Sequence, residues 1–204
     1  CVYLKVRLHH IGDFLKNDQI DSVVVSTDDP EIYESAMNIG CLDIGLRKDH
    51  LASSDASKLD VWKDSLDLAS QYGKYDIFVD LDATSPLRLQ SDINNAISVF
   101  KTESPDMVMS CCIARKNPYF NLVELDSFGC LMLSKQLAGK NIVSRQQAPI
   151  VYEHAASTYV LSSEYLRCCS HLYDGKVLPY LMPPERCWDI DSELDFRFVE
   201  FLMR

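Results

Sequence analysis

The sequence predicts an α/β fold built on a mostly parallel, doubly wound sheet. Its 204 residues are enough for one domain with a substantial core. A hydrophobic content of 47% and a charged content of 25% are typical of a globular chain. Strand signals alternate with helix signals along the sequence, which favours parallel strands with helices on both faces. We therefore expect a single domain over residues 1–204.

Charge and composition exclude several classes of protein. The net charge of −10 argues against a nucleic-acid-binding surface, because such a surface needs clustered Lys and Arg. No apolar run approaches the ~18 residues that a membrane span requires, so no membrane segment is expected. The eight cysteines include the adjacent pairs Cys111-Cys112 and Cys168-Cys169 and form no C-x-x-C motif. Reduced thiols in a cytoplasmic protein are the expectation for a chain of this size.

The first part of the chain predicts a strand followed by two helices. Residues 21–27 form a β-branched run, and Asp28, Asp29 and Pro30 follow it. Pro30 suits the first turn of a helix in "PEIYESAMNIG", and the two aspartates are expected to cap that helix. A second helix is expected in "KLDVWKDSLDLASQYG". The residues on its apolar face are Leu59, Trp62, Leu66 and Ala69.

The remaining elements continue this alternation, with one interruption. "YDIFVDL" and "DMVMSCCI" predict buried strands, and "SDINNAISVFK" between them predicts a helix with Ser91 as its N-cap. From about 117 to 149 the rhythm changes to two short strands around a turn at 126–129, which we interpret as an inserted arm. A strand at 157–161 and a closing amphipathic helix follow. The apolar residues of that helix are Leu194, Phe198, Phe201 and Leu202.

Paired aspartates occur where the predicted strands end, which is where open α/β sheets bind ligands. Asp80 and Asp82 alternate around one residue, so both should face the same side, at a cost unless a cation or hydrogen-bond donors compensate. Asp189 and Asp191 have the same spacing in "WDIDSELDF". Two oxygen ligands on one side suit Mg²⁺, but a polar turn in which Asp191 or Ser192 caps the last helix explains the pattern equally well.

Several segments resemble the acylneuraminate cytidylyltransferase family, in the same order as in that family. They are "VVVSTDDPEI", "LRKDHLASSDASKLDV", "DLDATSPLR", "RKNPYFNLVE", "SRQQAPIVYEHAASTY" and "WDIDSELDFRFVEFL". The combination of "DLDATSPLR", "RKNPYFNLVE" and "DIDSELDF" is similar to the bacterial branch that activates legionaminic acid. The resemblance implies a Rossmann-like, nucleotide-diphospho-sugar transferase-like fold. It also implies that a nonulosonic acid attacks the α-phosphorus of CTP, giving a CMP-sugar and pyrophosphate with the help of Mg²⁺.

The resemblance also implies roles for individual residues. Asp189 and Asp191 match the catalytic pair that holds the metal. Arg47 and Ser85 match positions that contact the nucleotide. The residues that match sugar-binding positions are Lys116, Arg145 and Tyr152, whereas Tyr159 is expected in the core; Asp82 is a further substrate-binding candidate, although the family carries another residue there. A guanidinium such as that of Arg145 suits bidentate recognition of a carboxylate.

Two departures from the family pattern bear on function. The family begins with a Gly-rich, basic loop that cradles the triphosphate, whereas this sequence starts "CVYLKVRLHH", so we expect the chain to lack that phosphate-binding loop. Much of the family also carries Gln-Pro where this chain has Asp82-Ala83. A carboxylate accepts hydrogen bonds or holds a cation but cannot donate unless protonated. Asp82 therefore favours a diamino sugar acid over sialic acid as substrate.

The sequence predicts an oligomeric state and leaves more than one activity open. The arm carries apolar residues that one small domain cannot easily cover. We therefore expect a homodimer in which the arm packs on the partner, as the resemblance also implies. Those residues are Pro118, Tyr119, Phe120, Leu122, Val123, Leu131 and Leu133. The alternatives to a CMP-nonulosonate cytidylyltransferase are a catalytically impaired homologue that acts as a binding or scaffold protein, and a related sugar nucleotidyltransferase that uses another base.

Overall fold

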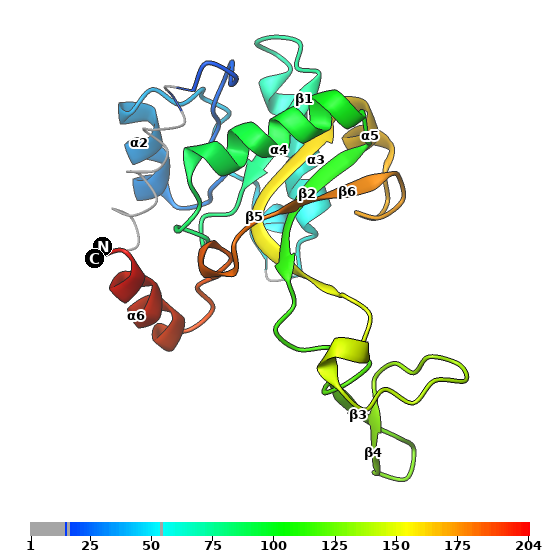
Figure 1. Ribbon diagram of the computed structural model, residues 1–204. Coiled ribbons are helices and arrows are strands. Elements are labelled where there is room, and N and C mark those ends of the chain that lie inside the picture. The colour runs from blue at the N-terminus through cyan, green and yellow to red at the C-terminus, as the bar shows by residue number, and fades with distance from the viewer. Residues whose placement is uncertain (1–14, 16, 54) are drawn as a thin grey trace.

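A computed structural model describes residues 15, 17–53 and 55–204, and its centre is a four-stranded sheet (Figure 1). The strand order is β1-β5-β2-β6, with bounds β1 (Ile77–Leu81), β2 (Met107–Ile113), β5 (Tyr152–Ser162) and β6 (Val177–Leu181). β5 is antiparallel to both β1 and β2, whereas β2 and β6 are parallel. β1, β2 and β6 therefore run in one direction. The predicted α/β fold is confirmed, with a mixed sheet in which β5 is the antiparallel strand.

Helices cover both faces of this sheet, as the alternating pattern predicts. α3 (Lys58–Ala69) and α5 (Ser163–Cys168) pack on one face, where Leu59, Trp62 and Leu66 are buried against residues of β2 and β5. α4 (Gln90–Glu103) packs on the other face. The apolar residues of α3 recur at helical spacing, so folding the segment as a helix places all of them against the sheet. Tyr159 is buried in this core, as expected.

Two expectations about element boundaries are wrong. No strand forms at 21–27; carbonyls of this run accept from loop amides, as when the Leu42 N–H donates to the Val23 carbonyl at 2.7 Å. A β-branched run becomes a strand only when a partner strand satisfies its backbone, and no described strand pairs with it. Ser91 does not cap α4, which begins one residue earlier. The Asp92 carboxylate instead reaches back to the Leu89 N–H at 2.9 Å.

The remaining predicted elements form as expected. α2 (Pro30–Asn38) is capped by Asp29, whose carboxylate accepts from the Glu31 and Ile32 N–H groups. Short 3-10 turns occur at Asp49–Leu51, Arg145–Gln147 and Pro184–Arg186. Within the described residues, no helix is both long and apolar enough to cross a bilayer.

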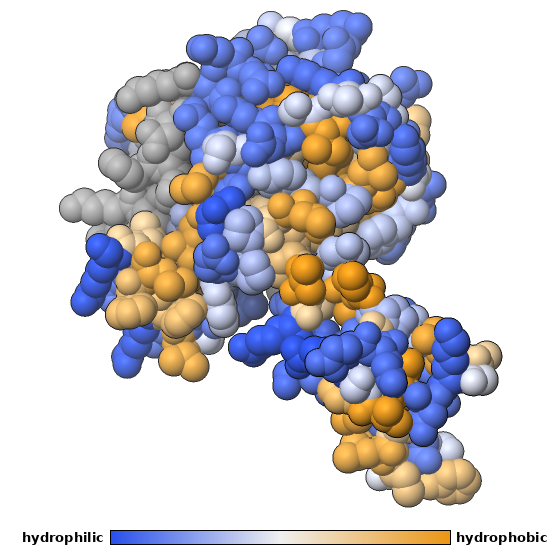
Figure 2. Space-filling model, viewed as in Figure 1, coloured by the Kyte–Doolittle hydropathy of each residue, from blue (hydrophilic) through white to orange (hydrophobic). Residues whose placement is uncertain are grey.

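The arm leaves the sheet after β2 and projects away from the rest of the molecule (Figure 1). β3 (Val123–Leu125) and β4 (Leu131–Leu133) pair as an antiparallel hairpin, which confirms the two short strands expected around the turn at 126–129. Gly129 closes that turn at a φ of +79°, a conformation that favours glycine. Apolar side chains gather on the hairpin surface (Figure 2).

The closing helix α6 (Glu193–Leu202) forms, but most of its apolar side is not covered. Val199 is its one buried residue within the described structure, whereas Leu194, Phe201 and Leu202 are exposed. Figure 2 shows this apolar surface over α6, apart from that of the arm. The edge-to-face contact of Phe198 with Trp188, at 4.6 Å between ring centroids, ties the helix to the loop that precedes it.

Candidate functional site

Two carboxylates at the carboxyl end of β1 share one cation. The Lys58 Nζ lies 3.3 Å from Asp80 Oδ2 and donates a hydrogen bond to Asp82 Oδ2. Both aspartates thus face the same side, as the alternating spacing predicts, and the compensating cation comes from the first residue of α3. Burial disfavours the charged amine, but Asp80 and Asp82 outweigh it and raise the pKa of Lys58, so the ammonium stays charged. Burial raises the pKa of Asp80, and Lys58 opposes that shift.

A second cation, Arg88, lies under the same loop and is almost fully buried. Its guanidinium donates to the Ser157 carbonyl at 2.5 Å and to the Asp82 carbonyl at 3.2 Å, which fixes the turn after β1 against β5. Burial lowers the pKa of Arg88 to about 10, against the opposing effect of Asp80 and Asp82. Two carboxylates and two cations therefore meet here with no net charge, which limits repulsion of an anionic ligand.

An irregularity in β5 brings His154 to this cluster. The register with β2 shifts between Met109, which pairs with Tyr159, and Cys111, which pairs with His154. Because extra residues of β5 are accommodated there, His154 and Tyr159 lie on the same face, with ring centroids 5.3 Å apart. Burial lowers the pKa of His154, Lys58 adds to this effect, and Asp82 opposes it.

The loop with the second aspartate pair lies beside the turn after β1. The Ile190 N–H donates to the Thr84 carbonyl at 2.9 Å, and the Ile190 side chain is buried. Asp189 Oδ1 is buried without a hydrogen-bond partner among the described residues, an arrangement that suits a ligand or cation. Ser192 accepts from the Asp195 N–H and caps α6, so the capping interpretation is confirmed for Ser192. Capping by Ser192 leaves the carboxylates of Asp189 and Asp191 available.

The two residues expected at the nucleotide have other contacts. Ser85 is only 2% exposed, which places it within the turn after β1 rather than on its surface. The Arg47 guanidinium donates to the side chain and the carbonyl of Ser26, and the Arg47 N–H donates to the Thr27 carbonyl. Arg47 therefore binds the last two residues of the 21–27 run, on a different segment from the aspartate pairs.

Two of the expected sugar-binding residues line one cleft. A cleft of about 640 Å³ at the base of the arm includes Lys116 and Tyr152, together with Arg115 and Lys135. Among the described residues Glu153 is the only acidic one that lines the cleft, so cations predominate. Arg145 lies in the turn at Arg145–Gln147 and does not line this cleft. The cleft follows the carboxyl end of β2, where the α/β ligand rule predicts a site.

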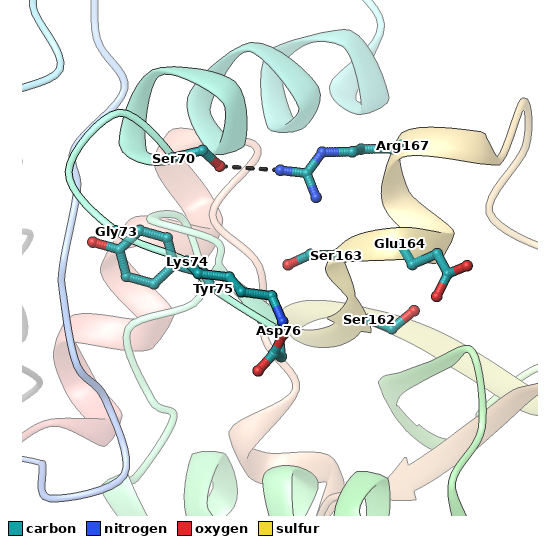
Figure 3. A pocket seen from close by; sticks show the side chains of 9 residues that line it. All are labelled: Ser70, Gly73, Lys74, Tyr75, Asp76, Ser162, Ser163, Glu164 and Arg167. Atoms are coloured by element: carbon teal, nitrogen blue, oxygen red, sulfur yellow. Dashed lines mark hydrogen bonds and ion pairs between the residues drawn. The ribbon is translucent and has the colours of Figure 1, made fainter.

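A second hollow lies at the opposite end of the sheet (Figure 3). Its volume is about 530 Å³, and it is lined by the loop before β1 and by α5. Cations and carboxylates are mixed here: Lys74 pairs with Asp76 at 3.1 Å, and Arg167 donates to Ser70 at 3.0 Å. The hollow adjoins the amino end of β1, so it does not belong to the site at the carboxyl ends.

Sequence reasoning did not single out Lys58, Arg88 or His154. One signal pointed to Lys58, because a cation at the first residue of a helix opposes the helix dipole and needs an acidic neighbour. No local sequence pattern identifies Arg88 or His154 as residues of the site. Their positions depend on the pairing of β1 with β5 and on the register shift between β2 and β5.

Comparison with known proteins identifies the family. No family model matches the chain. The chain is 36% identical over 184 residues to the post-translational flagellin modification protein B of Campylobacter coli, covering 89% of this chain and 77% of the relative. It is also 36% identical over 183 residues to the CMP-N,N'-diacetyllegionaminic acid synthase of Campylobacter jejuni, covering 89% and 76%. A solved CMP:2-keto-3-deoxy-manno-octonic acid synthetase in complex with CTP shares the fold, with a TM-score of 0.63 and 13% identity over 97% of this chain and 87% of that one. This chain belongs to the acylneuraminate cytidylyltransferase family, in the branch of the CMP-legionaminic acid synthases.

Proposed function

We propose that this protein is a cytidylyltransferase that activates a legionaminic-type nonulosonic acid with CTP, giving the CMP-sugar and pyrophosphate. The observation that carries the proposal is the 36% identity with a CMP-N,N'-diacetyllegionaminic acid synthase across 89% of this chain. The cluster of charged groups at the carboxyl ends of β1 and β2 supports it, because this edge of the sheet is where such folds bind ligands.

The reaction forms one bond and breaks one. The anomeric oxygen of the sugar acid bonds to the α-phosphorus of CTP, and the bond from that phosphorus to the departing pyrophosphate oxygen breaks. The proton of the anomeric hydroxyl passes to solvent. Since both reactants are anionic, the protein's main tasks are to bring them together and to offset their charge.

We propose the cleft at the base of the arm as the place of the sugar acid. Arg115, Lys116 and Lys135 supply cationic donors to its carboxylate, and Tyr152 supplies an aromatic wall. Arg145, on the same arm, is the further candidate for bidentate recognition. Asp82 and the turn that contains Ser85 follow the carboxyl end of β1, which β5 separates from β2, and are the proposed sugar and nucleotide side of the site. Arg47, which is bound to Ser26 and Thr27, is proposed to support the nucleotide from another segment.

Asp189 and Asp191 are the proposed holders of Mg²⁺. The buried Asp189 Oδ1, which lacks a protein donor among the described residues, fits this role, and two carboxylates suffice because Mg²⁺ keeps waters and substrate phosphates as its other ligands. When bound, the metal supplies charge neutralisation at phosphate oxygens. The contact between Ile190 and Thr84 holds the aspartate loop against the turn after β1.

The arm is the proposed dimer contact. A cytoplasmic location also remains a prediction. Phe128 is 89% exposed, and Leu125 and Leu131 beside it are also exposed. A second copy of the chain is the occupant that such a surface suits, because homodimers bury apolar patches by two-fold symmetry. The expectation that the chain lacks the family's phosphate-binding loop concerns residues 1–14, which lie outside the described residues.

Pyrophosphate release tests the proposed function. The protein is incubated with Mg²⁺, each of the four nucleoside triphosphates in turn, and either N,N'-diacetyllegionaminic acid or N-acetylneuraminic acid. We expect release with CTP only, and only when a sugar acid is present. Release with another triphosphate would instead indicate a related sugar nucleotidyltransferase. No release under any condition would favour the binding or scaffold alternative.

A further inference from the structure

Lys58 is held more firmly than a surface lysine. Its ammonium contacts Asp82 and lies 3.3 Å from Asp80, while it sits 4.3 Å from the centroid of the Tyr159 ring and 5.3 Å from that of Trp62. The two rings are themselves in edge contact, with centroids 5.0 Å apart. Carboxylates and aromatic rings both attract a cation, so the ammonium has a defined position although the side chain is partly exposed.

Asp82 is fixed through its main chain as well as its side chain. Its N–H donates to the Ser157 carbonyl at 3.0 Å, and its own carbonyl accepts from Arg88 at 3.2 Å. Lys58 binds one carboxylate oxygen, yet the side chain remains 29% exposed. The carboxylate is therefore held in a defined orientation and is still accessible from the strand end, so it is a suitable acceptor for a ligand N–H.

We propose that Lys58 is a positioning residue that sets the sugar preference of the site through Asp82. By holding Asp82 as an oriented acceptor, Lys58 favours sugar acids that bring an additional acylamino N–H over those with a single acylamino group. The inference rests on the proposed function. The inference goes beyond the proposed function by naming the residue that makes a carboxylate at this position selective rather than repulsive. Without Lys58, Arg88 alone would face Asp80 and Asp82, and the cluster would present a net negative charge to an anionic substrate.

The test compares kcat/KM for N,N'-diacetyllegionaminic acid and N-acetylneuraminic acid at saturating CTP and Mg²⁺. The variants are Lys58→Met, Lys58→Arg and the double variant Lys58→Met/Asp82→Asn. The matched control is Lys74→Met, because Lys74 also pairs with an aspartate beside β1 but at its amino end. We expect Lys58→Met to reduce the ratio of the two kcat/KM values about tenfold, the scale of one charged hydrogen bond. Lys58→Arg should restore part of the ratio, and Lys74→Met should leave it unchanged.

Each other outcome has a defined meaning. If Lys58→Met lowers kcat/KM equally for both sugars, Lys58 is only structural and the inference is overturned while the proposed function stands. Circular dichroism would reveal whether Lys58→Met fails to fold. In that case the double variant Lys58→Met/Asp82→Asn is measured instead, because it also removes one of the two carboxylates that Lys58 contacts. A wild-type ratio in that double variant would overturn the inference. No turnover of either sugar by the unaltered protein would overturn both the inference and the proposed function.

Discussion

At the scale of single residues, the charges beside β1 are better explained by a ligand site than by stability. Lys58 and Arg88 together balance Asp80 and Asp82, of which Arg88 is buried and the other three are partly buried. A buried ion pair is often no more stabilising than apolar residues of the same size, because desolvation offsets the attraction. Such a cluster at the carboxyl end of a strand, beside the loop with Asp189, therefore indicates a functional role.

Asp189 and Asp191, the aspartate pair before α6, are the most direct residues to alter. We expect Asp189→Asn and Asp191→Asn each to reduce kcat by at least about a hundredfold, because each removes a metal-binding charge without changing side-chain volume. Initial rates across a Mg²⁺ titration measure the effect, and circular dichroism checks the fold. Glu200→Gln, on the exposed side of α6, is the control. Turnover close to that of the unaltered protein in both aspartate variants would leave only the helix-capping turn.

His154 predicts a pH dependence of stability. In the folded protein, burial lowers the pKa of His154, Lys58 lowers it further, and Asp82 opposes the shift. The ring of Tyr159 lies beside the imidazole. The unfolded chain therefore binds the proton more readily than the folded protein does. The free energy of unfolding should therefore fall as the pH drops below about 6.5, and the loss should level off below the folded pKa. Denaturant unfolding at several pH values should show a smaller acid loss in His154→Gln. An acid loss as large as that of the unaltered protein would contradict this; His50→Gln is the control at an exposed histidine.

At the scale of elements, one buried carboxylate joins three parts of the fold. Asp92, in the first turn of α4, accepts from the Arg186 guanidinium at 2.8 and 3.0 Å and from the Tyr180 hydroxyl at 3.0 Å. It also accepts from the Leu89 N–H at the helix start. The side chain is only 1% exposed, so α4, β6 and the turn at Pro184–Arg186 meet at a carboxylate with all its charge compensated locally.

Removing that carboxylate should be costly. We expect Asp92→Ala to lower the free energy of unfolding by about 3–5 kcal/mol, because it leaves the Arg186 charge and the Leu89 amide without their acceptor. Lys74→Ala, which breaks an exposed ion pair, should change it by less than about 1 kcal/mol. Urea unfolding followed by fluorescence compares the two. Equal, small losses in both variants would show that Asp92 does not tie these elements together.

The exposed hairpin of the arm leads to a prediction about the oligomeric state. Phe128→Ser combined with Leu131→Ser should shift the protein from dimer to monomer, because Phe128 lies in the hairpin turn and Leu131 begins β4, and both side chains are exposed. Light scattering at micromolar concentration measures the mass. Leu194→Ser with Phe201→Ser, on the uncovered side of α6, is the matched control and should leave the dimer intact. A monomer before any substitution would refute the arm as a dimer contact.

At the scale of the whole molecule, local pattern predicted most elements but not the contacts between them. Leu59, Trp62 and Leu66 recur at helical spacing, so α3 and its buried side could be predicted. The run at 21–27 has the composition of a strand, but a strand also needs a partner, which local sequence does not reveal. Asp82 could be selected from its spacing, whereas its contact with Lys58 depends on how α3 docks on the sheet.

The most direct test of the central claim follows the phosphorus atoms of CTP. The protein is incubated with N,N'-diacetyllegionaminic acid and with CTP labelled at either the α- or the γ-phosphorus, and the products are separated. The proposed function predicts that the α-label appears in a sugar conjugate and that the γ-label appears in pyrophosphate. Transfer of the γ-label to the sugar, or no sugar-dependent transfer of either label, would contradict attack at the α-phosphorus and with it the assignment of this protein as a CMP-sugar synthase.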